Sequence, residues 1–181
     1  MKKTKSILLA AEGATVYDEM DSPVGILTII ASPQGLHAIL WDLYRASPEW
    51  QKIIDPLQKS DRDTVIAQTK KQLTEYFEGK RKTFDLPLQL AGTNFQRQAW
   101  NQLLAIPYGT TISYGEQAEK IGNKNKARAV GMANGLNPIS IVIPCHRVIG
   151  SNGCLVGFGG GIEKKAYLLR LEQTAEKSCR P

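Results

Sequence analysis

The sequence predicts an α+β protein in which a small mixed domain precedes a mainly helical one. In the first half, β-branched apolar runs flank a turn, which is typical of short antiparallel strands. In the second half, two capping boxes each precede apolar residues at helical spacing. The chain of 181 residues can bury a core in two small domains. We place the domains at residues 1–92 and 93–181.

The first half is predicted to form a hairpin followed by a helix. Two apolar runs, 26–31 and 36–41, flank a Ser-Pro-Gln-Gly turn. Asp63 is a candidate N-cap for the helix, and Gly79 is a candidate stop. His37 has no histidine or cysteine close to it in the sequence, so we interpret it as a strand residue rather than a ligand. The apolar positions of the helix are Ile66, Leu73, Tyr76 and Phe77.

The second half opens with a capping box at Thr93 and Gln96, which predicts a helix to about Ala105. The hydroxyl and the amide of these two residues can each satisfy a backbone N–H that has no partner within the helix. The predicted buried side consists of Phe95, Ala99, Trp100 and Leu103.

A second capping box, at Ser113 and Glu116, starts a short helix that Gly122 ends. After a basic turn, Asn125 is expected to cap a further helix over residues 126–135. Helix, short turn and helix, with small residues at the crossing, is the pattern of a helix-turn-helix. Many helix pairs without a DNA-binding role share this pattern.

The second helix of this pair has few side chains able to read bases. Lys126 and Arg128 lie at its start, and small residues such as Ala129 and Gly131 follow. A sequence-specific recognition helix usually presents several long polar side chains. This helix is suited to approach DNA closely while reading little sequence. Tight helix packing is an alternative reason for the small residues, and the two are compatible.

One stretch of the second half carries reactive residues. The apolar run 139–143 is predicted to be a short buried strand that Pro144 stops. Cys145, His146 and Arg147 follow directly, which places a soft nucleophile beside a base and a permanent cation. A lone cysteine is often only a small buried side chain. The Pro-Cys-His-Arg context favours chemistry here.

A glycine-rich segment, 155–161, and a final helix follow the cysteine. The segment lacks the glycine spacing of a phosphate-binding loop, and we interpret it as a flexible wall. The helix is predicted over about 162–171 and ends at Glu172. Its predicted apolar side consists of Ile162, Ala166 and Leu169.

The positive charge lies in the half that carries Cys145. Residues 93–181 hold 11 Lys/Arg and 5 Asp/Glu, whereas residues 1–92 hold 12 of each, so the second half carries the whole net charge of +6. A basic half suits a polyanion such as nucleic acid, although an ordinary basic surface has the same composition.

The cysteine content and the N-terminal residues argue against several classes of protein. Three cysteines without a CxxC pair and only two histidines argue against a disulfide framework and a zinc site, so we expect reduced thiols, no metal and no cofactor. Glu12 interrupts the apolar start too early for a signal peptide, and no apolar run approaches the roughly 20 residues of a membrane span. We therefore predict a cytoplasmic protein without membrane contact. The absence of apolar heptads favours a monomer.

Together these residues resemble the O6-alkylguanine-DNA alkyltransferases. The resemblance is carried by Pro144-Cys145-His146-Arg147-Val148, by the preceding Asn137-Pro138, and by the Gly-rich loop with an Arg-Leu-Glu ending at Glu172. It covers residues 93–173 closely. Over residues 1–92 the chain is consistent with the family's small N-terminal domain, which is ribonuclease-H-like.

The resemblance implies direct reversal of DNA damage, with duplex DNA containing O6-alkylguanine as the partner and O4-alkylthymine as a second substrate. Cys145 would accept the alkyl group, and His146 would take the thiol proton through a water while Glu172 orients the imidazole. Asn137 would brace the turn at the cysteine. The thioether product is a poor leaving group, so each molecule would react once.

The resemblance also implies that the target base is flipped out of the duplex. Arg128 would fill the vacated stack, and Tyr114 would crowd the phosphate and stabilise the departing guanine. Phe158 would stack on the base, and Gly159 could offer only its backbone N–H to O6. The full expected set is Tyr114, Lys126, Arg128, Ala129 and Gly131 for DNA, and Pro144, Val148, Phe158 and Gly159 for the pocket.

Two other functions remain as alternatives on the residues. The chain could be a DNA-binding regulator in which Cys145 is structural, but base-reading side chains are missing from residues 126–135. It could also be a cysteine hydrolase that uses Cys145 and His146. Adjacent Cys and His are awkward for direct proton transfer, and the base of such enzymes is usually distant in sequence.

Overall fold

The computed structural model describes residues 13–44 and 48–172, and the chain divides into two compact units. One unit comprises residues 1–92 and 138–140, and the other comprises 93–137 and 141–181. The short segment 138–140 belongs to the first unit because the backbone N–H of Ile39 donates to the carbonyl of Pro138 at 2.9 Å.

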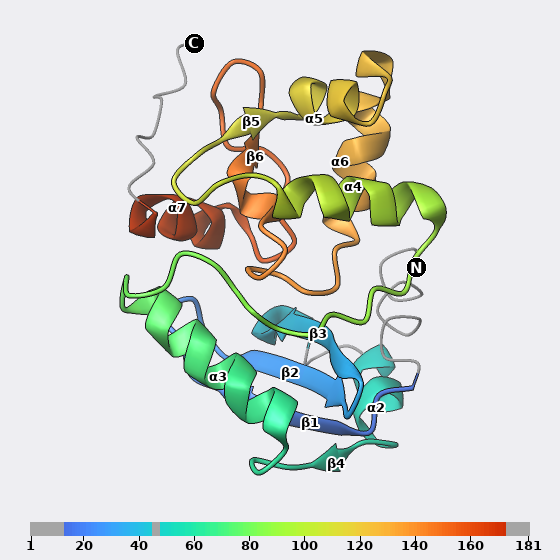
Figure 1. Cartoon of the computed structure of the whole chain (residues 1–181), viewed down its shortest axis with the longest axis vertical. Coiled ribbons are helices and arrows are strands. Elements are labelled where there is room, and N and C mark those ends of the chain that lie inside the picture. The colour runs from blue at the N-terminus through green and yellow to red at the C-terminus, as the bar shows by residue number, and fades with distance from the viewer. Residues whose placement is uncertain (1–12, 45–47, 173–181) are drawn as a thin grey trace. The chain divides into compact units, whose positions relative to one another are not determined.

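A four-stranded sheet forms the first unit (Figure 1), with the strand order β3-β2-β1-β4. Its strands are β1 (Val16–Met20), β2 (Leu27–Ser32), β3 (Gly35–Trp41) and β4 (Gln58–Lys59). Strands β1, β2 and β3 are antiparallel neighbours, whereas β4 pairs with β1 in parallel. The predicted hairpin is confirmed, and all side chains of β2 and β3 are buried.

The predicted helix is α3 (Thr64–Phe77), which runs along one face of the sheet (Figure 1). One carboxylate oxygen of Asp63 accepts hydrogen bonds from the backbone N–H groups of Val65 and Ile66, at 2.9 and 3.0 Å. The predicted N-cap is therefore confirmed. His37 lies in β3 as expected, buried, with Nε2 2.9 Å from the hydroxyl of Ser32. Two short helices that the sequence did not predict are η1 (Asp42–Tyr44) and α2 (Pro48–Ile54).

The second unit is mainly helical, and both predicted capping boxes are present in it. Its helices include α4 (Asn94–Leu104), α5 (Tyr114–Lys120), α6 (Ala127–Gly135) and α7 (Ile162–Leu171). Two short strands, β5 (Ile112–Ser113) and β6 (Val148–Ile149), pair in parallel. The predicted helix-turn-helix corresponds to α5, a 3-10 turn η2 (Lys124–Lys126), and α6.

The prediction that Asn125 caps the second helix of this pair is wrong. Asn123 is the capping residue, and its side-chain oxygen accepts from the backbone N–H of Asn125 at 2.9 Å. That cap starts η2, so α6 begins only at Ala127 and has no side-chain cap. A tighter 3-10 turn has taken the place of the first expected helical turn.

The predicted strand over residues 139–143 is also wrong. Ile139 forms an isolated bridge with Ile39, and the chain then turns. Ile141 has a φ of +74°, a left-handed conformation that a β-branched residue rarely adopts and that ends the extended run. The reactive residues lie instead on a 3-10 helix, η3 (Cys145–Arg147), so they do not alternate between two faces as strand residues would.

Two predicted buried faces need correction. On α7, Ile162 is 43% exposed, and Lys165, Leu168 and Leu169 are buried in its place. Compared with the predicted orientation, α7 is rotated about its axis, because the Lys165 ammonium group donates hydrogen bonds to backbone carbonyls inside the unit. On α4 the buried residues are Ala99, Trp100 and Leu103, whereas Phe95 is only half-buried.

Within residues 13–44 and 48–172, no helix is long and apolar enough to cross a membrane, and no group of three His, Cys, Asp or Glu could hold a metal ion. Cys154 is disulfide-bonded, so the expectation of reduced thiols is wrong for this cysteine, while Cys145 is a free thiol. The N-terminal segment judged too short for a signal peptide lies outside the described residues. The cytoplasmic location and the monomeric state stay predictions.

Candidate active site

Cys145 lies at the start of η3, where a tight turn delivers its thiol. Pro144 has φ −82° and ψ 63°, the geometry of an inverse γ-turn, and the backbone N–H of Cys145 donates to the carbonyl of Ile143 at 2.8 Å. The Asn137 amide nitrogen donates to the same carbonyl at 2.8 Å and to Sγ of Cys145 at 3.4 Å. A donor at the sulfur favours the thiolate, and Cys145 remains 8% exposed.

The turn that precedes this cysteine is strained. The left-handed conformation of Ile141 costs about 1–3 kcal/mol for a residue of this kind. Ile141 is fully buried, and so is Ile143 two residues later. Burial of these side chains holds the backbone in a shape that the local sequence would not choose.

His146 is completely buried and is oriented by one partner. Its Nε2 lies 2.8 Å from Oε1 of Glu172, whereas its Nδ1 has no hydrogen-bond partner among the described residues. Burial lowers the pKa of His146 and outweighs the opposing effect of Glu172, so the imidazole is neutral. Because Glu172 accepts the Nε2 proton, Nδ1 carries the lone pair and is the basic atom.

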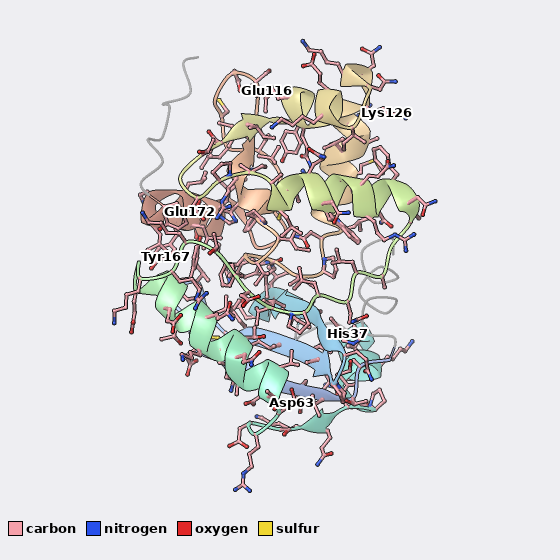
Figure 2. The ribbon with its side chains drawn as sticks, viewed as in Figure 1. His37, Asp63, Glu116, Lys126, Tyr167 and Glu172 are labelled. Carbon is pink, nitrogen blue, oxygen red and sulfur yellow. The ribbon has the colours of Figure 1, made fainter. Side chains whose placement is uncertain are left out.

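Glu172 caps the end of α7 (Figure 2) and accepts hydrogen bonds from three residues. Besides His146, Arg147 donates Nε–H to Oε2 at 2.9 Å and Nη2–H to Oε1 at 3.0 Å, and the Gly109 backbone N–H donates to Oε2 at 3.1 Å. Burial by itself would raise the pKa of Glu172, but the hydrogen bonds from His146 and Arg147 and the positive charge of Arg147 lower it to about 2. The carboxylate is therefore ionised at any physiological pH.

Arg147 and Gly109 complete the surroundings of this carboxylate. Arg147 donates a further N–H to the carbonyl of Ile106 at 2.6 Å, and its guanidinium lies 5.8 Å from the centre of the Tyr108 ring. Gly109 has a φ of +73°, and a Cβ there would lie 2.9 Å from the carbonyl oxygen of Glu172. Only glycine fits without displacing the end of α7.

Tyr114 and the glycine-rich segment form another side of the site. The Tyr114 hydroxyl donates to the carbonyls of Val156 and Gly157, at 3.1 and 3.3 Å. Burial, followed by the nearby charge of Cys145, raises the pKa of Tyr114 to about 12, so the phenol keeps its proton. A Cβ at Gly131 would lie 3.5 Å from the Tyr114 ring, which shows that α6 packs directly against this residue.

Lys165 is a site residue that the sequence reasoning missed. Its side chain is completely buried, and its ammonium group donates to the carbonyls of Val148 and Val156 at 2.6 and 2.9 Å. Burial lowers the pKa of Lys165 to about 8, partly offset by the charge of Cys145. Its spacing of three and four residues from Leu168 and Leu169 was the available signal, because those positions share one helix face.

The structure brings together Cys145, His146, Glu172 and Asn137 and places Tyr114 against the neighbouring loop. Three of the residues expected to contact DNA do not join this cluster. Lys126 is exposed on the turn before α6 (Figure 2), and Arg128 and Ala129 are exposed on α6. Gly131 is half-buried under Tyr114. The expected pocket residues are divided, with Pro144 and Val148 buried and Phe158 and Gly159 half-buried.

Two family models match the chain. The model described as the DNA-binding domain of 6-O-methylguanine DNA methyltransferase matches residues 94–174, and that described as its ribonuclease-like domain matches residues 15–90. Among curated relatives, the methylated-DNA–protein-cysteine methyltransferase of Mycolicibacterium paratuberculosis is 45% identical over 157 residues, or 87% of this chain and 92% of the relative. That of Methanosarcina acetivorans is 41% identical over 156 residues, or 86% and 97%.

Solved structures agree with these relatives. The O6-methylguanine methyltransferase of Mycobacterium tuberculosis matches with a TM-score of 0.77 and 42% identity, covering 91% of this chain and 94% of that one. A structure of the OGT protein of the same organism in complex with DNA matches with a TM-score of 0.78 and 43% identity, covering 88% and 93%. From the cysteine site, the α+β fold and these matches, we conclude that the chain belongs to the 6-O-methylguanine DNA methyltransferase family.

Proposed function

We propose that this protein repairs DNA by transferring an alkyl group from O6 of guanine to Cys145. The observation that carries the proposal is the chain of buried contacts from Arg147 through Glu172 to His146, next to a free thiol. Relatives named methylated-DNA–protein-cysteine methyltransferase support the same reaction. In this proposal residues 1–92 act as a scaffold domain, and residues 93–181 carry the reaction.

The charges of the site define the proton path. Glu172 is ionised and accepts the Nε2 proton of His146, which leaves the Nδ1 lone pair free to take a proton from the Cys145 thiol through one water molecule. The thiolate attacks the alkyl carbon in an SN2 displacement. A C–S bond forms while the C–O6 bond breaks, and its electron pair remains on the guanine. The phenol of Tyr114, protonated at neutral pH, can stabilise that charge.

Access to the target carbon requires the base to leave the duplex. Arg128 is exposed at the start of α6, and its side chain is long enough to fill the vacated stack. The small exposed residue Ala129 allows the helix to approach the DNA backbone closely, and Gly131 lies against the Tyr114 ring. In this proposal duplex DNA with O6-alkylguanine is the partner, and O4-alkylthymine is a second substrate.

The reaction is proposed to occur once per molecule. A thioether is a very poor leaving group. The polar side chains around Cys145 are engaged in hydrogen bonds with one another or with the sulfur, so they do not displace the alkyl group from it. The alkylated protein is the end product, so repair consumes one protein per lesion.

The test is intact and peptide mass spectrometry after mixing the protein with a duplex that contains one O6-methylguanine. We expect one added methyl group per protein, located on Cys145, and loss of the lesion from the DNA. An unmodified Cys145 with the lesion still present would overturn the proposal. Repeated turnover would contradict the single-use reaction.

Arg128→Ala is expected to slow the reaction with duplex DNA by about 10- to 100-fold, since unstacking a base costs a few kcal/mol that the arginine would offset. The free base O6-benzylguanine needs no extrusion, so its reaction should be nearly unchanged. The measurement is the second-order rate constant of Cys145 alkylation with each substrate. Arg97→Ala is the matched control, because it removes the same charge from an exposed site on α4. Equal rates for both variants on duplex DNA would contradict this role.

Lys165→Met is expected to loosen the segment that carries Val156. Methionine keeps the length of the side chain but removes the ammonium group. The buried Val148 carbonyl loses this donor, at a cost of about 1–3 kcal/mol, whereas the Val156 carbonyl keeps the Tyr114 hydroxyl as a donor. We expect a lower thermal unfolding temperature and slower alkylation by both substrates. Lys164→Met, at the less buried neighbouring position, is the control and should change both quantities less than Lys165→Met does. Indistinguishable unfolding curves for the two variants would rule out the contribution of Lys165.

A further inference from the structure

Two amide side chains face each other inside the helix-turn-helix. Gln117 on α5 is completely buried, and Asn134 on α6 is 5% exposed. The Asn134 amide nitrogen donates to Oε1 of Gln117 at 2.7 Å, and the Gln117 amide nitrogen donates to Oδ1 of Asn134 at 3.2 Å. The two residues therefore form a reciprocal pair, with each amide acting as donor and acceptor.

The pair is also connected to α4. The Gln117 amide nitrogen donates to the backbone carbonyl of Ala99 at 3.0 Å. One residue further along α4, Trp100 donates its indole N–H to the carbonyl of Ala133 at 3.0 Å. Hydrogen bonds thus join α4, α5 and α6 at one level of the unit, immediately behind the exposed side of α6.

A buried amide pair is a poor way to gain stability but a good way to fix geometry. Apolar residues of similar volume would avoid the desolvation of two amides, and such replacements are often neutral or stabilising. Hydrogen bonds, unlike apolar contacts, are satisfied only over a narrow range of distance and direction. In coiled coils a single buried asparagine fixes the register of helices in this way.

The position of helix α6 depends on few buried side chains. Its sequence is Ala-Arg-Ala-Val-Gly-Met-Ala-Asn-Gly, and its buried residues are Val130, Ala133 and Asn134. A Cβ at Gly131 would reach van der Waals contact with the Tyr114 ring, at 3.5 Å, so the glycine itself contributes no side-chain contact there. Val130 and Ala133 hold α6 by apolar contacts, which depend little on direction, and the amide pair adds hydrogen bonds that do depend on it.

We infer that the Gln117–Asn134 pair positions α6 on α5, and thereby sets the spacing between Tyr114 and Arg128 that base extrusion requires. Gln117 lies one turn after Tyr114 on α5, and Asn134 follows Arg128 on α6. Both amides are positioning residues, because their side chains are buried between α5 and α6 and contact neither the Cys145 thiol nor the exposed side of α6. The inference rests on the proposed function, since it assigns these residues to the DNA step of that reaction.

The test compares duplex DNA containing O6-methylguanine with the free base O6-benzylguanine. The variants are Gln117→Met, Asn134→Leu, and the double variant, which keep side-chain volume and remove the hydrogen bonds. We expect alkylation of Cys145 by duplex DNA to fall about 10-fold or more, because misplacement of about 1 Å can cost 10²-fold in rate. Alkylation by the free base should stay within about 2-fold of the wild type, since the thiol site is intact.

Two further variants separate positioning from simple destabilisation. The reversed pair, Gln117→Asn with Asn134→Gln, can rebuild the amide contact and should recover part of the duplex rate. Trp100→Phe removes the indole hydrogen bond to α6 but leaves the pair, so it should lower the unfolding temperature without changing the duplex-to-free-base ratio. The ratio is measured only on variants whose unfolding is cooperative at the assay temperature, and Trp100→Phe provides the stability reference.

Duplex rates like the wild type in the double variant would overturn the inference, as would an equal fall with both substrates. A fall in the ratio for Trp100→Phe as large as for the double variant would also overturn it. Failure of the proposed function is recognised separately, because the wild-type protein would then leave Cys145 unmodified by either substrate.

Discussion

Replacing Cys145 with serine is expected to abolish alkyl transfer, lowering the rate by at least about 10⁴-fold, the scale of losing an essential member of a catalytic unit. A hydroxyl is far less acidic than a thiol, so neither Asn137 nor His146 can produce enough of its anion. Serine is close to cysteine in size, and its hydroxyl oxygen can accept the hydrogen bond that the Asn137 amide donates to the sulfur. The variant should therefore fold and still bind DNA.

The measurement for Cys145→Ser is mass spectrometry of the protein, together with the lesion content of the duplex after prolonged incubation. Cys154→Ser is the control, because it removes a sulfur from the same unit but not the free thiol at the site. The control should still accept one methyl group. A methylated Cys145→Ser protein would show that another residue is the acceptor.

Replacing Glu172 with glutamine is expected to damage both the reaction and the fold. Arg147 would lose the carboxylate that pairs with its buried guanidinium, and breaking such a pair costs about 3–5 kcal/mol. His146 would lose an acceptor-only, charged partner at Nε2. The glutamine NH2 group can face the imidazole instead and donate to it, so the basic lone pair would no longer be confined to Nδ1. By analogy with the loss of the carboxylate in a serine protease triad, we expect a rate decrease of about 10²- to 10⁴-fold.

Urea unfolding and the rate of Cys145 alkylation measure the two effects of Glu172→Gln separately. Glu163→Gln is the matched control, because Glu163 lies on the same helix, α7, and is exposed. It should change neither quantity measurably. Wild-type stability in Glu172→Gln would mean that Arg147 does not depend on this carboxylate.

The low pKa of Glu172 also predicts the acid dependence of stability. The pKa of Glu172 is about 2 in the folded protein and about 4.5 for an ordinary glutamate, so the stabilising contribution is complete above about pH 4.5. It is lost as the pH falls from there toward 2, and it amounts to about 3 kcal/mol. Unfolding free energies measured over this range should fall more steeply for the wild type than for Glu172→Gln. Parallel curves would contradict the assignment.

Much of the local structure could be predicted from neighbouring residues. Asp63, Thr93 and Ser113 cap helices because each lies two or three residues from the N–H groups that it satisfies. The hairpin follows from two apolar runs joined by a short turn. The Pro-Cys-His-Arg sequence pointed to the proposed reactive residues for a similar reason, since the proposed nucleophile and base are adjacent in the chain.

The predictions that were wrong concern positions where a distant partner overrides local preference. Residues 139–143 have the composition of a strand, but burial of Ile141 and Ile143 and the bridge to Ile39 impose a turn. Lys165 would face solvent in an isolated helix, yet the carbonyls of Val148 and Val156 draw it inside.

The sequence by itself thus determined the α+β class, the starts of α3, α4 and α5, the helix-turn-helix pattern and the Pro-Cys-His-Arg motif that carries Cys145. Only the tertiary structure decided how the site is charged and held in place. Glu172 meets Gly109 across 63 positions of the chain, Arg147 across 25, and Gln117 meets Asn134 across 17. Such contacts form because burial makes an unpaired charge or amide costly, and that cost depends on the whole fold rather than on sequence neighbours.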